Sequence, residues 1–217
     1  MAAYTGNVHV GGPAQVRELT DLVLSKVAVG PMDNNVYLLR CRRTGDQLLI
    51  DAAADAGTLI DLAGSGGLRV IATTHRHPDH VGALVEVQAA TGARTAASPL
   101  DAPGLPLVVD QTLADGEVLT VGSMALRAIH LSGHTPGGLA LFYDDPEGHG
   151  HLFSGDSLFP GGVGRTLSSQ DFTALMDDVE SKVFSLPDET WVYPGHGADT
   201  TIGTERPQLP AWRSRGW

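Results

Sequence analysis

Residues 73–84, TTHRHPDHVGAL, are the feature that most constrains the fold of this chain. They follow the apolar run 68–72, LRVIA, which predicts a buried strand. Side chains two residues apart on an extended chain point to the same side, so His75 and His77 are expected to face one way. A buried strand that leads directly into so many polar side chains predicts a binding site at the end of a sheet.

A helix is predicted to begin directly after these histidines. Pro78 is favoured at the first helical position and places Asp79 and His80 in the first turn. Neutral imidazole suits zinc, and carboxylates complete ligand sets of this kind. The strand end and the helix start therefore predict one cluster of metal-binding donors, which consists of His75, His77, Asp79 and His80.

Three later motifs repeat the pattern of an apolar strand followed by a glycine-rich turn with a donor. LSGHTPGG carries His134, FSGDSLFPGG carries Asp156 and YPGHG carries His196. Glycine beside a ligand lets the backbone turn sharply and approach a metal ion closely. Because each motif follows a strand, we expect all three side chains to converge on the first cluster.

Seven donors exceed the four that one tetrahedral zinc ion takes. Two ions that share a bridging carboxylate would use the set fully, and such pairs lie about 3.5–4 Å apart. In this interpretation His75, His77 and His134 hold one ion, Asp79, His80 and His196 hold the other, and Asp156 bridges them. The other four histidines are interpreted as surface or strand residues: His9, His130, His149 and His151.

Short runs rich in Val, Leu and Ile, bounded by Gly, Pro or Asp, predict strands along the whole chain. They lie at 8–10, 35–41, 47–52, 68–74, 105–110, 124–131, 138–144, 151–156 and 190–195. Residues 44–46 are expected to close a hairpin between the second and third of these. Helices are predicted at 55–64, at 78–92 and at 168–186.

The predicted helix at 78–92 carries an apolar stripe of Val81, Leu84, Val85 and Ala89, and the helix at 168–186 begins with a Ser168-to-Asp171 cap. Helices among meander-like strands predict an α+β fold with two mixed, mostly antiparallel sheets and helices outside. The halves 1–110 and 111–217 have similar element order, which favours a four-layer αββα sandwich. Since no linker interrupts the chain, we expect residues 1–217 to form a single domain.

The charge of the chain excludes several functions. The formal net charge is −11, which disfavours nucleic acid and anionic membranes as partners. The only basic run, 40–43, is expected to lie at a hairpin end. The single cysteine, Cys41, precludes an internal disulfide and fits a reducing compartment. No apolar run reaches the roughly 20 residues of a membrane helix, and the N-terminus lacks signal-peptide character, so we expect a cytoplasmic protein.

The motifs THRHPDH, GHTPGG, FSGDSLF and YPGHG resemble those of the metallo-β-lactamase superfamily. Within it, GDSLFPGGVGRT and VYPGHGADTTIGTE are similar to the glyoxalase II group, the hydroxyacylglutathione hydrolases. The resemblance implies a thioesterase with two divalent ions, zinc first and iron or manganese as alternatives, and a substrate like S-lactoylglutathione. It implies attack by a metal-bridging hydroxide, which Asp79 orients and which forms when Asp79 accepts a proton from the bridging water.

The resemblance also assigns Arg165, after the GGVG turn, to the substrate. It is expected either to reach a substrate carboxylate or to pair with an acid beneath the site. Longer glyoxalase II enzymes carry a C-terminal helical region for glutathione, whereas here only ERPQLPAWRSRGW follows the core, with Trp212 and Trp217 expected to pack on it. The thiol carrier and the oligomeric state therefore stay open. The alternative functions are a persulfide dioxygenase with a single iron and a hydrolase of lactones or other esters.

Overall fold

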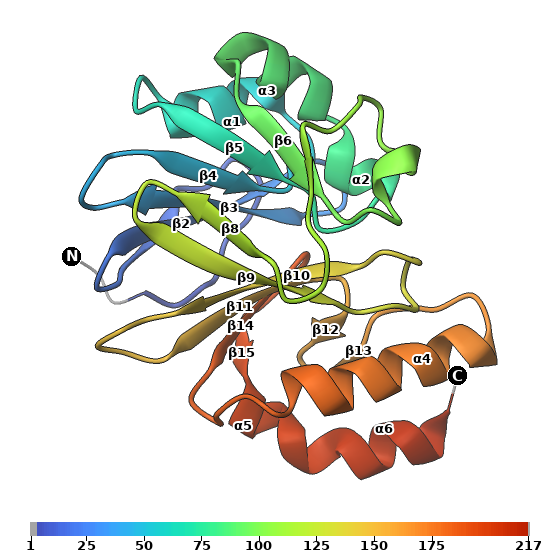
Figure 1. Cartoon of the computed structure of the whole chain (residues 1–217). Helices are drawn as coiled ribbons and strands as arrows, with labels where there is room; N and C mark the ends of the chain where they lie inside the picture. The colour runs from blue at the N-terminus through green and yellow to red at the C-terminus, as the bar shows by residue number, and fades with distance from the viewer. Residues whose placement is uncertain (1–3, 217) are drawn as a thin grey trace.

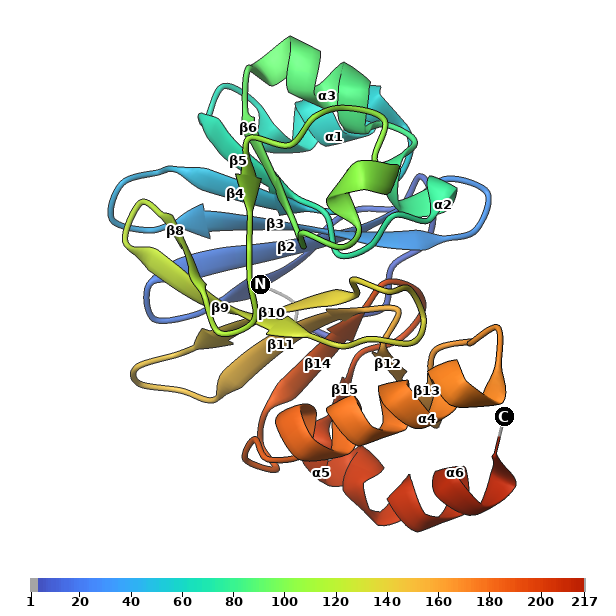
Figure 2. The same ribbon diagram turned by 45° about the vertical axis from the view of Figure 1, so that its right-hand side comes forward.

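Two β-sheets lie face to face in the middle of the protein, and helices cover their outer faces (Figures 1 and 2). This computed structural model describes residues 4–216. Its layers run helix, sheet, sheet, helix, which confirms the predicted α+β four-layer sandwich. Among the described residues, no helix combines the length and apolar character that crossing a membrane requires.

The first sheet has seven strands in chain order, from β1 to β7. Pairing is antiparallel from β1 to β4 and parallel from β4 to β7, so this sheet is mixed. The turn between β3 and β4 closes the hairpin that the sequence predicts. The strands are β1 Gln15–Glu18, β2 Leu22–Val29, β3 Asn34–Cys41, β4 Gln47–Ile50, β5 Leu68–Ala72, β6 Arg94–Ala97 and β7 Gln111–Thr112.

The second sheet has six strands in the order β15-β14-β11-β10-β9-β8, and only β11 and β14 pair in parallel. A separate hairpin of β12 and β13 lies beside it. The division between the sheets falls after β7, close to the predicted boundary of the halves. The strands are β8 Val118–Val121, β9 Met124–His130, β10 Leu139–Asp144, β11 Gly150–Gly155, β12 Leu158–Phe159, β13 Gly162–Val163, β14 Trp191–Pro194 and β15 Thr200–Thr201.

Helices α1 and α3 cover the first sheet, and α4, α5 and α6 cover the second (Figure 1). Ser168 caps α4 because its hydroxyl accepts a hydrogen bond from the Asp171 amide, as the sequence predicts. Single 3₁₀ or π turns occupy Ala102–Gly104, Val179–Val183 and Arg206–Gln208. The helices are α1 Ala56–Ala63, α2 Pro78–Val81, α3 Leu84–Thr91, α4 Ser169–Asp178, α5 Ile202–Glu205 and α6 Leu209–Arg215.

Three apolar clusters fill the spaces between these layers. The cluster between the sheets includes Tyr37 of β3, whose ring meets Phe153 of β11 edge-on with centroids 5.3 Å apart. The cluster beneath α4 and α6 includes Trp212, which is 3% exposed, so the predicted packing of this side chain is confirmed. Trp217 lies outside the described residues.

Two of the predicted strands are wrong. At 8–10 the chain forms a turn instead, because the Gly12 amide donates to the His9 carbonyl. At 105–110 it forms a loop in which Val108 is 94% exposed, and Pro106 has no N–H for a ladder. Conversely, β1, β2, β6 and β8 are strands that the sequence pattern did not indicate.

The predicted helix at 78–92 is two helices, α2 and α3. It breaks because the Ala83 amide donates to the Ala52 carbonyl of another segment, 3.0 Å away. The buried face of α3 differs from the predicted stripe. Val85 is therefore 49% exposed, and Val87 is buried beside Leu84.

Candidate metal centre

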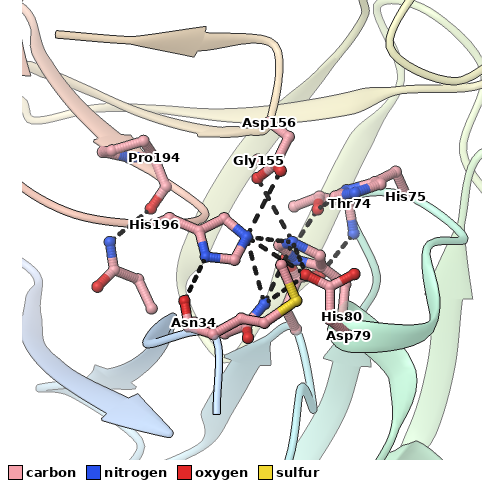
Figure 3. A network of polar contacts seen from close by, with 12 residues as sticks. Asn34, Thr74, His75, Asp79, His80, Gly155, Asp156, Pro194 and His196 are labelled. Atoms are coloured by element: carbon pink, nitrogen blue, oxygen red, sulfur yellow. Dashed lines mark hydrogen bonds and ion pairs between the residues drawn. The ribbon is translucent and has the colours of Figure 1, made fainter. Parts of the chain in front are cut away.

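The ends of four strands, β5, β9, β11 and β14, and the start of α2 meet at one end of the sandwich. Figure 3 shows His75, Asp79, His80, Asp156 and His196 of this region close together. There the structure brings together the side chains that the sequence predicts to converge. His75 and His77 follow β5, and Asp79 and His80 lie in α2. From the second sheet come the three remaining residues: His134 after β9, Asp156 after β11 and His196 after β14.

Six of these residues form two groups of three potential ligands, each with donor atoms within 4.8 Å of one another. The groups are the ones that the sequence predicts: His75, His77 and His134 in the first, and Asp79, His80 and His196 in the second. We refer to them below as the first and the second group. The third possible set, Asp51, His75 and His80, contains a carboxylate that other partners already occupy.

The donor atoms of the second group have the spacing that one small cation requires. Nε2 of His80 lies 3.2 Å from Nε2 of His196, and Oδ2 of Asp79 lies 3.5 and 3.4 Å from them. Ligands about 2.0–2.1 Å from a zinc ion stand roughly 3.3–3.4 Å apart at tetrahedral corners. The three distances therefore fit three corners of such a site.

Asp156 lies between the two groups. Its Oδ2 is 3.7 Å from Nε2 of His134 and 3.6 Å from Nε2 of His196, so one carboxylate faces both groups. Its Oδ1 is buried, has no hydrogen-bond partner among residues 4–216, and lies 3.4 Å from Nε2 of His80. This position suits the bridging role that the sequence predicts for Asp156.

The histidine rings are held so that Nε2 faces the centre. Nδ1 of His134 lies 2.7 Å from the Arg165 carbonyl, and Nδ1 of His196 lies 3.0 Å from the Met32 carbonyl. A carbonyl only accepts, so in both rings Nδ1 carries the hydrogen. In the neutral ring with this tautomer, Nε2 presents a lone pair, which is the form that binds a metal ion.

Asp51, which the sequence analysis did not single out, fixes His80 and the end of β5. Its carboxylate lies 2.9 Å from Nδ1 of His80 and accepts 2.7 Å hydrogen bonds from both the amide and the hydroxyl of Thr74. Asp51 directly follows β4 and has a positive φ of 60°. Its signal was the same as that of the other donors, an acidic residue at a strand end.

The electrostatics of the cluster favour a cation there. Burial lowers the pKa of His75 well below its usual value, and the neighbouring histidines lower it further, so this imidazole is neutral. Burial also opposes protonation of His80, yet the adjacent carboxylates of Asp156 and Asp51 raise its pKa. Positive charge beside these carboxylates is therefore favourable even in a buried place.

Asn34 lies beside the second group and was also missed by the sequence analysis. Its Nδ2 donates to Oδ2 of Asp79 at 3.0 Å and lies 3.4 Å from Nε2 of both His80 and His196. Burial raises the pKa of Asp79, but this hydrogen bond and the nearby histidines bring it below the usual value. Asp79 is therefore ionised at neutral pH.

Two observations test whether a metal pair fits these residues. Nε2 of His75 and Nε2 of His134 are buried and have no hydrogen-bond partner within residues 4–216, and both face the centre. In addition, a Cβ on Gly195 would overlap Oδ1 of Asp156 and lie 2.6 Å from Cε1 of His80, so only glycine leaves this space open. Unpaired donors around a preserved space fit bound cations.

Arg165 is exposed at the rim of the centre. It lines a pocket together with His77, His134 and Leu167. Its side chain has no ion pair or hydrogen bond with another described residue, so the expected pairing with an acid beneath the site is not seen. The substrate role of Arg165 stays a prediction.

The sequence pattern of the Metallo-beta-lactamase superfamily matches residues 29–196 of this chain, which include every candidate ligand. The chain belongs to this superfamily. The hydroxyacylglutathione hydrolase of Rhodospirillum rubrum is 36% identical over 166 residues, which cover 76% of this chain and 62% of that protein. The chain thus spans less than two thirds of the length of this relative.

Solved structures with similar sequences share the fold. The di-iron-bound form of TTHA1623 is 34% identical, has a TM-score of 0.70, and the match covers 83% of this chain and 96% of that one. The BLEG-1 B3 metallo-beta-lactamase is 29% identical, with a TM-score of 0.76 and coverage of 87% and 98%. The superfamily and the donor set together give candidate sites for two metal ions.

Proposed function

We propose that the protein is a binuclear metallo-hydrolase that cleaves small thioesters of the S-lactoylglutathione kind. Zinc is the first candidate for both ions, and iron or manganese are the alternatives. The proposed ligands are His75, His77, Asp79, His80, His134, Asp156 and His196, with Asp79 also acting in catalysis and Arg165 in substrate binding.

The observation that carries this proposal is the position of Asp156 between two groups of three donors. A shared carboxylate is what a metal pair needs to sit close enough to act on one substrate. The similarity to a hydroxyacylglutathione hydrolase supports thioesters as the substrate class. The similarity to a protein with two bound irons supports a pair of ions rather than one.

When bound, two ions in this position would lower the pKa of a water molecule and polarise a carbonyl oxygen. Asp79 would accept a hydrogen bond from that water, align it with the thioester carbon and take up its proton. The Asn34 amide holds Oδ2 of Asp79 in place for this role. The departing thiolate is a weak base, so its release needs little proton donation.

The test begins with protein reconstituted in zinc, iron or manganese, with metals counted per chain by mass spectrometry. We expect two ions per chain and turnover of S-lactoylglutathione or of a thioester of another small thiol. Asp79→Asn should lower kcat by roughly 10²–10⁴, the usual contribution of a positioned base. Asp61→Asn, at an exposed position of α1, is the matched control and should leave both readouts unchanged.

Full activity in Asp79→Asn would refute the role given to this residue. One iron per chain with oxygen uptake on glutathione persulfide would replace the proposal by a persulfide dioxygenase. Turnover of lactones without turnover of thioesters would keep the metal centre and change the substrate class.

The proposal includes a small-molecule partner, no nucleic-acid or membrane partner, and a reducing, cytoplasmic setting. The net charge of −11 argues against nucleic-acid and anionic-membrane partners, since binding to phosphate groups requires clustered cations. The single Cys41 is buried at the end of β3 and forms no disulfide, which suits a reducing compartment.

A further inference from the structure

The ring of His77 differs from the other candidate histidine ligands in how it is held. In the other four rings, Nδ1 lies no more than 3.0 Å from an oxygen atom of another residue: His75, His80, His134 and His196. The His77 ring has no hydrogen-bond partner among residues 4–216, although it meets the His134 ring edge-on with centroids 4.5 Å apart. The place of the His77 ring therefore depends on its backbone.

The backbone next to His77 is held by Asp101, a residue of the loop after β6 that is 1% exposed. Oδ2 of Asp101 accepts a hydrogen bond of 3.1 Å from the amide of Arg76, the residue between His75 and His77. Nε of Arg76 also lies 3.8 Å from Oδ1 of Asp101, so the guanidinium offsets part of the negative charge of this buried carboxylate.

The second oxygen of Asp101 reaches the other sheet. Oδ1 accepts a hydrogen bond of 2.9 Å from the amide of Gly137, which lies three residues after His134 in the turn between β9 and β10. The Ser98 hydroxyl donates to the Gly137 carbonyl and accepts from the Asp101 amide. A Cβ on Gly137 would lie only 2.6 Å from the Asp101 amide, so the approach of these loops requires glycine. Asp101 thus connects the segment of His77 to the segment of His134.

A capping role does not account for Asp101. It directly precedes the 3₁₀ turn Ala102–Gly104, yet its side chain forms no capping hydrogen bond there. Both oxygens point instead to segments that carry candidate metal ligands. Asp110 in the same loop is the contrast, because its Oδ2 accepts from the amide and the hydroxyl of Thr95 in β6, away from every candidate ligand.

We propose that Asp101 is a positioning residue for the first group: it fixes His77 relative to His134 and so raises the affinity of the first group for its ion. This inference rests on the proposed metal centre and not on the substrate. Hydrogen-bond partners that orient metal ligands typically contribute 10–100-fold to metal affinity. Within the described chain Asp101 forms no hydrogen bond with the second group, so the ion there should be held as before.

The test is a zinc titration of metal-free protein in competition with a chromophoric chelator, which gives an affinity for each ion. In Asp101→Asn one oxygen remains as an acceptor, while the new NH₂ group faces a backbone N–H and that contact is lost. We expect one affinity to fall about 10–100-fold and the other to change less than about threefold. Asp110→Asn is the matched control and should alter neither affinity.

Two ligand variants assign the weakened ion. His196→Ala removes a ligand of the second group only, and His77→Ala removes a ligand of the first group only. Asp101→Asn should weaken the ion that the intact first group of His196→Ala still holds. It should have no effect on the ion held by His77→Ala, because a residue that acts through the His77 ring has nothing to position once that ring is gone.

Equal losses at both ions, no loss at either, or the same loss with and without the His77 ring would overturn the role given to Asp101. Should Asp101→Asn not fold, Ser98→Ala removes the hydroxyl that joins Asp101 to Gly137 and decides the matter. It should weaken the same ion about fivefold, the value of one hydrogen bond, and an unchanged affinity would refute the inference.

Failure of the proposed function is separable, because zinc binding is measured without a substrate. A wild-type chain that binds one ion would refute the binuclear proposal. A weaker ion in Asp101→Asn would then still support the positioning role, and an equally tight one would refute it. A wild-type chain that binds no zinc would refute both.

Discussion

Replacing the buried Lys26 tests how the loop that carries His196 is held. Lys26 lies in β2 with a fully buried side chain. Its Nζ donates to Oδ1 of Asp199 at 2.7 Å and to the carbonyls of Gly6 and Gly197 at 2.8 and 2.9 Å. Lys26→Met has similar length but no charge and no donor, so it removes all three contacts while filling most of the space.

The size of the expected loss in stability follows from the unpaired Asp199 carboxylate that Lys26→Met leaves in the interior. The Asp199 carboxylate is 2% exposed and would keep only the hydrogen bond from the Tyr4 hydroxyl. Breaking a buried ion pair by removing one partner costs about 3–5 kcal/mol. We therefore expect Lys26→Met to lower the free energy of unfolding by roughly 3–5 kcal/mol, and Lys26→Met with Asp199→Asn to regain about 2 kcal/mol or more because no charge stays unpaired.

The assay is urea unfolding of metal-free protein at pH 7, followed by circular dichroism. Lys182→Met is the matched control, since Lys182 is part-exposed and pairs with Asp178 and Asp115 on the surface. It should cost about 1 kcal/mol or less. A loss below about 1 kcal/mol in Lys26→Met, or a double variant no more stable than the single one, would refute this reasoning.

Two further changes test the site and the pH dependence of stability. Gly195→Ala should lower the number of bound ions per chain, measured by mass spectrometry, because its methyl group collides with the Asp156 carboxylate, whereas Gly57→Ala, with open space around it, should not. Burial lowers the pKa of His151 from 6.5 to about 4, so the unfolded chain takes up this proton first as the pH falls. The stability that His151 contributes is complete above pH 6.5 and is lost between 6.5 and about 4, by up to roughly 2–3 kcal/mol. In His151→Asn, which retains a polar atom near the Tyr193 hydroxyl, metal-free unfolding over this range should depend less on pH, and an unchanged slope contradicts the assignment.

Most of the fold was predictable because its strands follow local rules. The strands around the candidate metal centre are apolar runs that end at Gly, Pro or Asp, and such runs are recognisable without tertiary information. The pattern failed at β2 because Ser25 and Lys26 interrupt its apolar run. The burial of Lys26 is explained by its hydrogen-bond partners in the folded chain, which are Gly6, Gly197 and Asp199.

The same distinction applies to the candidate site. The donors were recognisable because they follow strands or begin a helix, in motifs with a distinctive local sequence. Asp51 also follows a strand but has no second donor beside it, and Asn34 begins a strand, so their importance depends on which side chains the fold brings next to them.

Each group of candidate ligands combines both sheets. His134 and His196 come from loops of the second sheet, while their partners follow β5 or lie in α2. An ion in either group would thus be a cross-link between the halves, in addition to the apolar layer between them. Removal of the metal by a chelator should therefore weaken the contact between the two sheets before either sheet unfolds. The two fragments of a chain cut between β7 and β8 should bind each other more tightly with metal than without.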